Sequence, residues 1–91
     1  MAFGRDKEKQ TRRERLEFRQ HLEKLEPLLE ESLRDLGALA VEQYNRDGFR
    51  ADALWARAAE VAAIEDEANL VRRAIDERLN RDQLEQLAKA R

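Results

Sequence analysis

The sequence predicts an all-α protein folded as an antiparallel two-helix hairpin that resembles a coiled coil. Ala, Leu, Glu, Lys and Arg account for 58 of the 91 residues, a composition typical of long helices. The few β-branched residues never alternate with polar residues as they would in a strand. Apolar residues recur at helical spacing instead, and one clear turn signal stands near the middle of the chain.

The first helix is predicted over residues 12–46, after a flexible basic arm at residues 1–11. Thr11 and Glu14 match the capping box, in which each side chain accepts a hydrogen bond from a backbone N–H at the helix start. An apolar row follows, with spacings of four, three, four, four, three, four and four: Phe18, Leu22, Leu25, Leu29, Leu33, Leu36, Ala40 and Tyr44. This eleven-residue repeat keeps the row nearly straight along the helix. Leu28 and Leu39 form a second row beside it.

Pro27 conflicts locally with this helix, because a proline removes one backbone hydrogen bond and clashes with the preceding turn. The apolar row keeps its phase from Leu25 to Leu29, which favours a continuous, kinked helix over a break. The alternative is a helix that begins at Pro27, where proline suits the first position, and a separate segment before it.

The turn is predicted over residues 47–52. Asp47 and Gly48 form the turn signal, with Gly48 in the left-handed conformation that ends a helix. Phe49 is expected to cover the open end of the hairpin. Asp52 can cap the next helix with its carboxylate.

The second helix is predicted over residues 53–88. Its main apolar row is nearly heptad: Leu54, Ala58, Val61, Ile64, Ala68, Val71, Ile75 and Leu79. A flanking row consists of Trp55, Ala59, Ala62, Leu70 and Ala74. After Leu79 the apolar positions move off this line to Leu84, Leu87 and Ala88, so the last turns either fray or contact a different neighbour.

Both helices carry more apolar surface than one neighbouring helix can cover, which predicts self-association. A homodimer of hairpins, forming a four-helix bundle, is the simplest closed assembly. The alternative is a monomeric hairpin whose leucine face binds another protein. The expected core and interface residues are Leu22, Leu25, Leu29, Leu33, Leu36, Leu54, Trp55, Val61, Ile64, Val71, Ile75 and Leu79.

No catalytic residue, metal site or cofactor is predicted. The chain has no Cys, which excludes thiol nucleophiles and Cys-ligated zinc. His21 follows Glu17 by four residues and supplies at most half of a metal site, so a surface histidine is the better interpretation. Ser32 has no base within reach. We therefore do not expect an enzyme.

Nucleic-acid binding is the main functional alternative, because residues 1–20 carry a local net charge of +3. The candidate phosphate contacts are Arg5, Lys7, Lys9, Arg12, Arg13 and Arg15. Acidic residues interrupt this arm, and no aromatic residues offer bases a stacking surface. The same charges could instead meet the acidic middle of a second hairpin, since residues 21–48 carry a local net charge of −4.

The sequence shows no signal peptide and no membrane span. Its longest uncharged stretch, Leu36 to Val41, is far shorter than the roughly 20 residues that cross a bilayer. Residue 2 is Ala, not the Gly required for myristoylation, and no C-terminal Cys is present for prenylation. We expect a cytoplasmic protein without membrane contact.

Two stretches, Leu36 to Val41 and Leu54 to Glu65, together with the intervening Asp47-Gly48-Phe49, resemble helical hairpins in uncharacterised proteins of actinobacterial type. The resemblance implies a hairpin fold and a bacterial origin. Some of those hairpins are coupled to a zinc ribbon, a module that this chain cannot form without Cys. The leading hypothesis is a small structural or adaptor protein that acts through helix–helix contacts.

Overall fold

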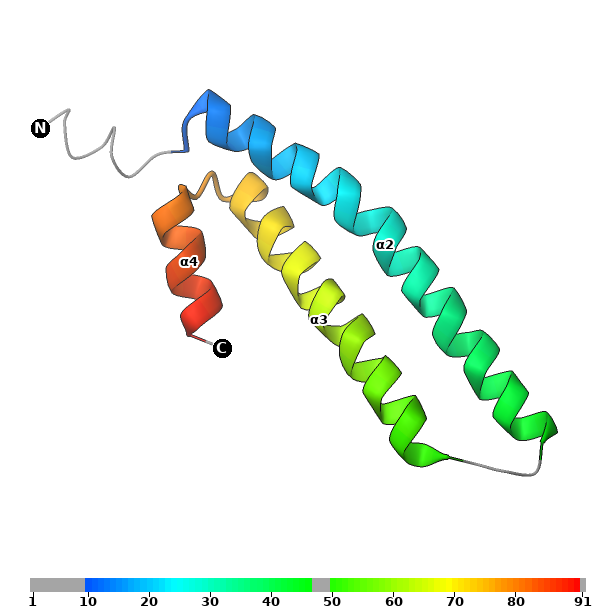
Figure 1. Cartoon of the computed structure of the whole chain (residues 1–91). Coiled ribbons are helices and arrows are strands. Elements are labelled where there is room, and N and C mark those ends of the chain that lie inside the picture. The colour runs from blue at the N-terminus through cyan, green and yellow to red at the C-terminus, as the bar shows by residue number, and fades with distance from the viewer. Residues whose placement is uncertain (1–9, 47–49, 91) are drawn as a thin grey trace, which may run out of the picture.

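The computed structural model describes residues 10–46 and 50–90, which form three helices and no strand. The helices are α2 (Arg12–Asn45), α3 (Ala51–Asp76) and α4 (Arg81–Lys89). Figure 1 shows α2 and α3 running antiparallel as a hairpin, with the short α4 folded back beside α3. The predicted all-α hairpin is therefore confirmed.

The helix α2 begins where the capping box predicts. The Thr11 hydroxyl oxygen accepts from the Glu14 N–H at 3.0 Å, and the Glu14 carboxylate accepts from the Thr11 N–H at 3.0 Å. The helix then continues through Pro27 to Asn45 without interruption. Of the two alternatives at Pro27, the continuous helix is the one observed.

The turn end of the hairpin differs from its prediction in two details. Helix α3 begins at Ala51, two residues early, and Arg50 occupies the N-cap position without a side-chain hydrogen bond. Asp52 is therefore not the cap and lies in the first turn, where a carboxylate is favourable near the helix N-terminus. The buried Gln43 side chain ties the two helices together here, accepting from the Arg50 N–H at 2.8 Å. The predicted roles of Gly48 and Phe49 lie outside the described residues.

The prediction of a single second helix over residues 53–88 is wrong, because α3 ends at Asp76 and α4 starts at Arg81. Arg78 adopts the left-handed conformation with φ of 55°. The Arg78 N–H donates to the Ile75 carbonyl at 3.4 Å, and the Leu79 N–H donates to the Ala74 carbonyl at 2.9 Å. This pair of bonds is the Schellman motif that ends helices.

A second capping box starts α4 immediately after this stop. The Asn80 side chain accepts from the Gln83 N–H at 2.9 Å, and the Gln83 side chain accepts from the Asn80 N–H at 2.9 Å. The change of chain direction between α3 and α4 explains why the apolar row shifts after Leu79. The last turns contact a different neighbour, since Leu84 packs against the hydrophobic core.

The hydrophobic core lies at the end of the hairpin that α4 covers. Its buried members are Phe18 and Leu25 from α2 with Ala68, Val71 and Ala74 from α3. Leu22, Ile64, Ile75, Leu79 and Leu84 pack around them and are half-buried. Ala68 and Ala74 are 0% exposed, so their small side chains let the helices approach closely.

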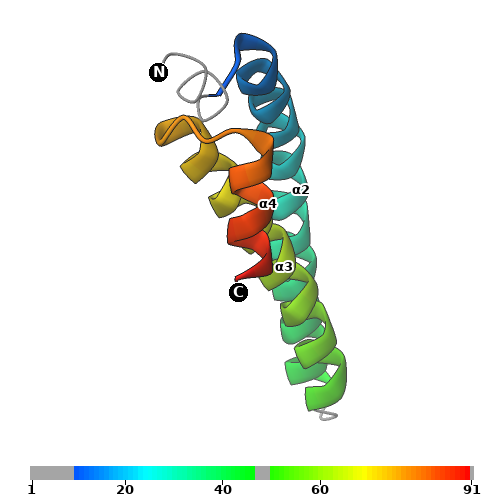
Figure 2. The same ribbon diagram turned by 90° about the vertical axis from the view of Figure 1, so that its left-hand side faces the viewer.

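The molecule is long and thin, with extents of 66 × 24 × 13 Å. The shortest extent is close to the diameter of a single helix, about 10–12 Å. Figure 2 shows that α4 lies beside only one part of the hairpin. We call that part the proximal half (α2 residues 12–27, α3 residues 63–76, and α4) and the remainder the distal half (α2 residues 28–45 and α3 residues 51–62).

Candidate functional site

Polar contacts fix α4 and the α3–α4 connection to the start of α2. The Gln10 side-chain amide donates to the Ala74 and Leu79 carbonyls at 2.9 and 3.0 Å. The second Glu14 carboxylate oxygen accepts from the Arg81 N–H at 2.7 Å, so one side chain caps the starts of both α2 and α4. The Thr11 backbone hydrogen bond is the main cause that lowers the Glu14 pKa, and the Arg81 N–H adds to it. The proximal half is thereby held together within one chain, and its one large exposed apolar side chain among the described residues is Leu16, at 57%.

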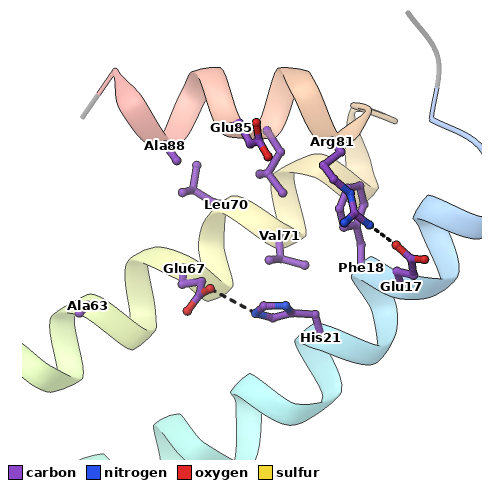
Figure 3. A pocket seen from close by; sticks show the side chains of 11 residues that line it. Glu17, Phe18, His21, Ala63, Glu67, Leu70, Val71, Arg81, Glu85 and Ala88 are labelled. Carbon is purple, nitrogen blue, oxygen red and sulfur yellow. Dashed lines mark hydrogen bonds and ion pairs between the residues drawn. The ribbon is translucent and has the colours of Figure 1, made fainter. Parts of the chain in front are cut away.

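A pocket of about 480 Å³ lies where the three proximal helices meet (Figure 3). Two ion pairs cross it. His21 Nε2 lies 3.3 Å from a Glu67 oxygen, and the Arg81 guanidinium contacts the Glu17 carboxylate. Figure 3 shows both pairs bridging α2 to the other helices, with Phe18, Val71 and Leu70 forming the apolar part of the lining. The predicted half-site of Glu17 and His21 is thus divided between two different partners.

The ionisable side chains that line the pocket are Glu17, His21, Glu67, Arg81 and Glu85, and the first four form the two pairs just described. Within residues 10–46 and 50–90, no group of three or more His, Cys, Asp or Glu side chains is arranged to hold a metal ion. Its His and Arg side chains are already paired with carboxylates, and no Ser, Thr or Cys lines it. We interpret the pocket as the seam along which α4 is attached.

The distal half leaves large apolar side chains uncovered. Leu33 is 48% exposed, Val41 60%, Tyr44 83% and Trp55 77%. Leu33 and Trp55, which the sequence placed in the core or interface, therefore lie outside the core of a single chain. Leu28, of the second leucine row, is 46% exposed. Among the other predicted core residues, Leu25, Val61 and Val71 are buried, whereas Leu22, Leu29, Leu36, Leu54, Ile64, Ile75 and Leu79 are half-buried.

Between Leu33 and Tyr44 on α2, and between Trp55 and Ala62 on α3, one face of the hairpin is free of charge. Helix α2 contributes Leu33, Gly37, Ala40, Val41 and Tyr44, all exposed. Helix α3 contributes Trp55, Ala58, Ala59 and Ala62, also exposed. At about 100° per residue, each set clusters on one side of its helix. We call these nine residues the apolar strip.

The opposite face of the distal half is acidic. A groove of about 660 Å³ runs there between the helices, and it is lined by Asp35, Ala38, Leu39, Glu42, Ala53, Ala56, Arg57 and Glu60. We call it the acidic groove. Its lining also shows that α2 residues 35–42 lie beside α3 residues 53–60. On each helix the apolar strip and the acidic groove lie on opposite sides of the residues that face the partner helix, such as Leu36 and Val61.

The predicted phosphate contacts are only partly described. Arg12 and Arg13 are exposed in the first turn of α2, and Arg15 is half-buried. Arg5, Lys7 and Lys9 lie outside the described residues. Arg12, Arg13 and Arg15 belong neither to the apolar strip nor to the acidic groove, so nucleic-acid binding stays a prediction that depends on the arm.

Comparisons with protein-family models, with curated proteins and with solved structures find no match for this chain. The resemblance to actinobacterial-type hairpins therefore stays a prediction. None of the described helices combines the length and apolar character that crossing a membrane requires.

Three features of the structure go beyond the sequence prediction: the two faces of the distal half, the second capping box, and the contacts of Gln10 and Gln43. Apolar rows follow from helical spacing, but the division of the distal half into a charge-free and an acidic face depends on how the two helices pair. The second capping box, Asn80 to Gln83, was present as a signal and predicts the start of α4. Gln10 and Gln43 carry no such signal, because their partners are distant backbone groups.

Proposed function

We propose that this chain is a small structural or adaptor protein that acts through helix–helix contacts and self-associates through its distal half. The observation that carries the proposal is the exposure of Leu33, Val41, Tyr44 and Trp55 in a hairpin whose other half packs against its own α4. No catalytic step is part of the proposed role.

Two general properties of soluble proteins support this proposal. Soluble monomers rarely expose contiguous apolar surface larger than a few hundred Å², and larger patches mark interaction sites. Stable domains also need at least two packed layers of secondary structure, whereas the distal half consists of two helices in a single layer. A second layer supplied by another chain covers the exposed side chains.

Light scattering after gel filtration across a dilution series tests the proposal. The monomer mass is 10.7 kDa, so self-association raises the apparent mass toward twice that value at high concentration. Trp55→Ala lowers the apparent mass at a fixed concentration, because the indole is 77% exposed and contributes little to the fold of one chain. A mass of one chain at all concentrations up to hundreds of micromolar contradicts self-association.

The dependence of binding on salt concentration distinguishes the nucleic-acid alternative from self-association. Binding to phosphates weakens steeply as salt concentration rises, because it depends on counterion release. Assembly through apolar surface does not weaken in this way and is strengthened by sulfate. The same dilution series in low and high salt, with and without a fluorescent DNA or RNA oligonucleotide, distinguishes the two.

A further inference from the structure

We propose that a second copy of this chain packs on the apolar strip in an antiparallel arrangement, so that only the distal halves overlap. The inference rests on the proposed self-association and adds the face, the orientation and the residues at the contact. The two proximal halves then project in opposite directions.

The chemistry of the hairpin surface changes along a single row of each helix. On α2 the row follows the exposed Leu16 through Arg19, Glu23, Glu26 and Glu30 and continues, at spacings of three and four, into Leu33, Gly37, Ala40 and Tyr44. On α3 the row through Trp55, Ala59 and Ala62 continues into Asp66, Asn69 and Arg73. Both rows switch between apolar and polar at the same level of the hairpin. Exposure to solvent alone does not explain why charged residues are missing from this face in one half and present in the other.

Gly37 points independently to the same face. It lies in the interior of α2, where Gly is less favourable than Ala. A Cβ built at this position meets nothing within 4 Å apart from the helix's own backbone, so packing within the chain does not require a glycine. Gly37 lies at the centre of the α2 side of the strip. Close approach of another helix backbone from outside explains a glycine there.

The strip is complementary to itself when two copies are related by a two-fold axis across the rods. The axis passes between Gly37 and Ala40 on α2, and between Ala58 and Ala59 on α3. These points lie within about one helical turn of the same level, since Asp35 to Glu42 and Ala53 to Glu60 line one groove. The Trp55 ring then lies over Ala62 of the partner subunit, and the small residues meet at the axis. Isologous interfaces of this kind are the commonest in homodimers.

Charge distribution favours this orientation and this face. In the antiparallel arrangement Glu23, Glu26 and Glu30 of the two copies lie at opposite ends of the overlap, away from one another. A parallel arrangement in register places the carboxylates of Glu23, Glu26 and Glu30 near their own copies, which is repulsive. The acidic groove is a poor alternative, because three of its four charged residues are carboxylates and α4 blocks the proximal end of that side.

The size of the strip sets the strength expected of this dimer. The twelve residues of α2 from Leu33 to Tyr44 span about 18 Å, so two helices side by side bury about 1,000 Å² in total across both copies. That area is at the lower limit for a specific interface. We therefore expect a dimer with a dissociation constant in the micromolar range, about 110 Å long when two 66 Å rods overlap by about 20 Å.

The test compares leucine substitutions at two adjacent exposed positions, Gly37→Leu and Ala38→Leu. Gly37 lies on the apolar strip and Ala38 lines the acidic groove. We expect Gly37→Leu to raise the dimer dissociation constant at least tenfold, as measured by sedimentation equilibrium, and Ala38→Leu to change it less than threefold. We also expect Gly37→Leu to raise the melting midpoint of the dilute monomer, because leucine favours the helix more than glycine does.

The outcomes separate the face from the proposed function. A wild-type dimer with equal effects of the two substitutions, or with tighter binding by Gly37→Leu, overturns the proposed face and leaves self-association intact. A wild-type chain that stays monomeric overturns both. Circular dichroism of the dilute variants checks folding. If Gly37→Leu does not fold, Trp55→Ala takes its place, and an unchanged dissociation constant for that variant overturns the proposed face.

A cysteine cross-link tests the orientation, because the chain has no Cys of its own. Ala59→Cys lies beside the two-fold axis and is expected to form a disulfide-linked dimer under mild oxidation. Asn69→Cys is on the same row of α3 in the proximal half and is expected to remain a free thiol. Equal cross-linking of the two variants contradicts the antiparallel overlap.

Discussion

The two halves of this hairpin are built from the same two helices but differ in how well their apolar side chains are covered. In the proximal half, a third helix, two capping boxes and the Gln10 amide close the structure around Phe18 and Val71. In the distal half, one buried valine and the Gln43 hydrogen bond hold the helices together while Trp55 and Tyr44 remain exposed. The comparison teaches that helix pairing alone does not bury an apolar face, and that the nine residues of α4 cover the hairpin only in the proximal half and only on the side opposite the apolar strip.

The largest expected effect compares one aromatic side chain from each half. Phe18 is 6% exposed, so Phe18→Ala removes core packing and costs about 3–5 kcal/mol of unfolding free energy. Trp55→Ala in the dilute monomer changes that free energy by less than about 0.5 kcal/mol, because the ring contacts mainly solvent. Urea unfolding below micromolar concentration measures both. Similar losses for the two variants contradict the division into a closed and an open half.

Glu14→Ala tests the joint that closes the proximal half. The substitution removes hydrogen bonds to the backbone N–H groups of Thr11 and Arg81, so we expect a loss of about 1–2 kcal/mol. Faster hydrogen exchange in α4 than in the wild type identifies the detached element. Glu17→Ala serves as a control, since it removes only an exposed ion pair with Arg81 and costs less than about 1 kcal/mol.

Acid is expected to weaken the same joint. The Glu14 pKa is lowered in the folded chain, so its carboxylate stabilises the fold above the unfolded-state pKa. That contribution is lost as the pH falls from about 4, the ordinary glutamate range, through the lowered pKa of the folded state. Thermal melting between about pH 2 and pH 6 measures this slope. Glu14→Gln keeps an acceptor without the charge and should melt with a shallower dependence on pH; an identical slope contradicts the assignment.

Arg78→Gly has the smallest expected effect and the opposite sign. Arg78 holds a left-handed conformation at the end of α3, which glycine adopts without steric cost. We expect a gain of about 0.5–1 kcal/mol, seen as a higher melting temperature with α4 still attached. The neighbouring Glu77→Gly, at the C-cap, lacks this advantage and serves as the control. A loss of stability in Arg78→Gly argues against the observed helix stop.

The sequence predicts the elements that depend on local signals. The Thr11 and Glu14 capping box gives the start of α2, and the uninterrupted phase of Leu25 and Leu29 favours the continuous helix through Pro27. The end of α3 could not be found this way, because Arg78 is in a conformation that usually signals itself with glycine. The off-line positions of Leu84 and Leu87 did indicate a change of neighbour.

The candidate site depends on the tertiary arrangement of the helices, so less of it could be predicted from the sequence. Leu25 and Leu33 belong to the same apolar row of the sequence, yet Leu25 is 7% exposed and Leu33 is 48% exposed in the fold. Helix α4 does not cause this difference, because it lies on the acidic-groove side of the hairpin. That Gly37 and Trp55 lie on the same face of the hairpin can be recognised only when the alignment of α2 against α3 is known. Hydrophobic rows show that a helix has an apolar side, and the pairing determines whether that side is covered.

Hydrogen–deuterium exchange of backbone amides at two protein concentrations is the most direct measurement of this difference between the halves. We predict that amides in α2 residues 33–44 and α3 residues 55–62 gain protection as the concentration rises from below micromolar to hundreds of micromolar. Amides around Phe18 and Val71 should keep the same protection at both concentrations. Protection that is uniform along the hairpin and independent of concentration would contradict the proposed difference between a closed and an open half.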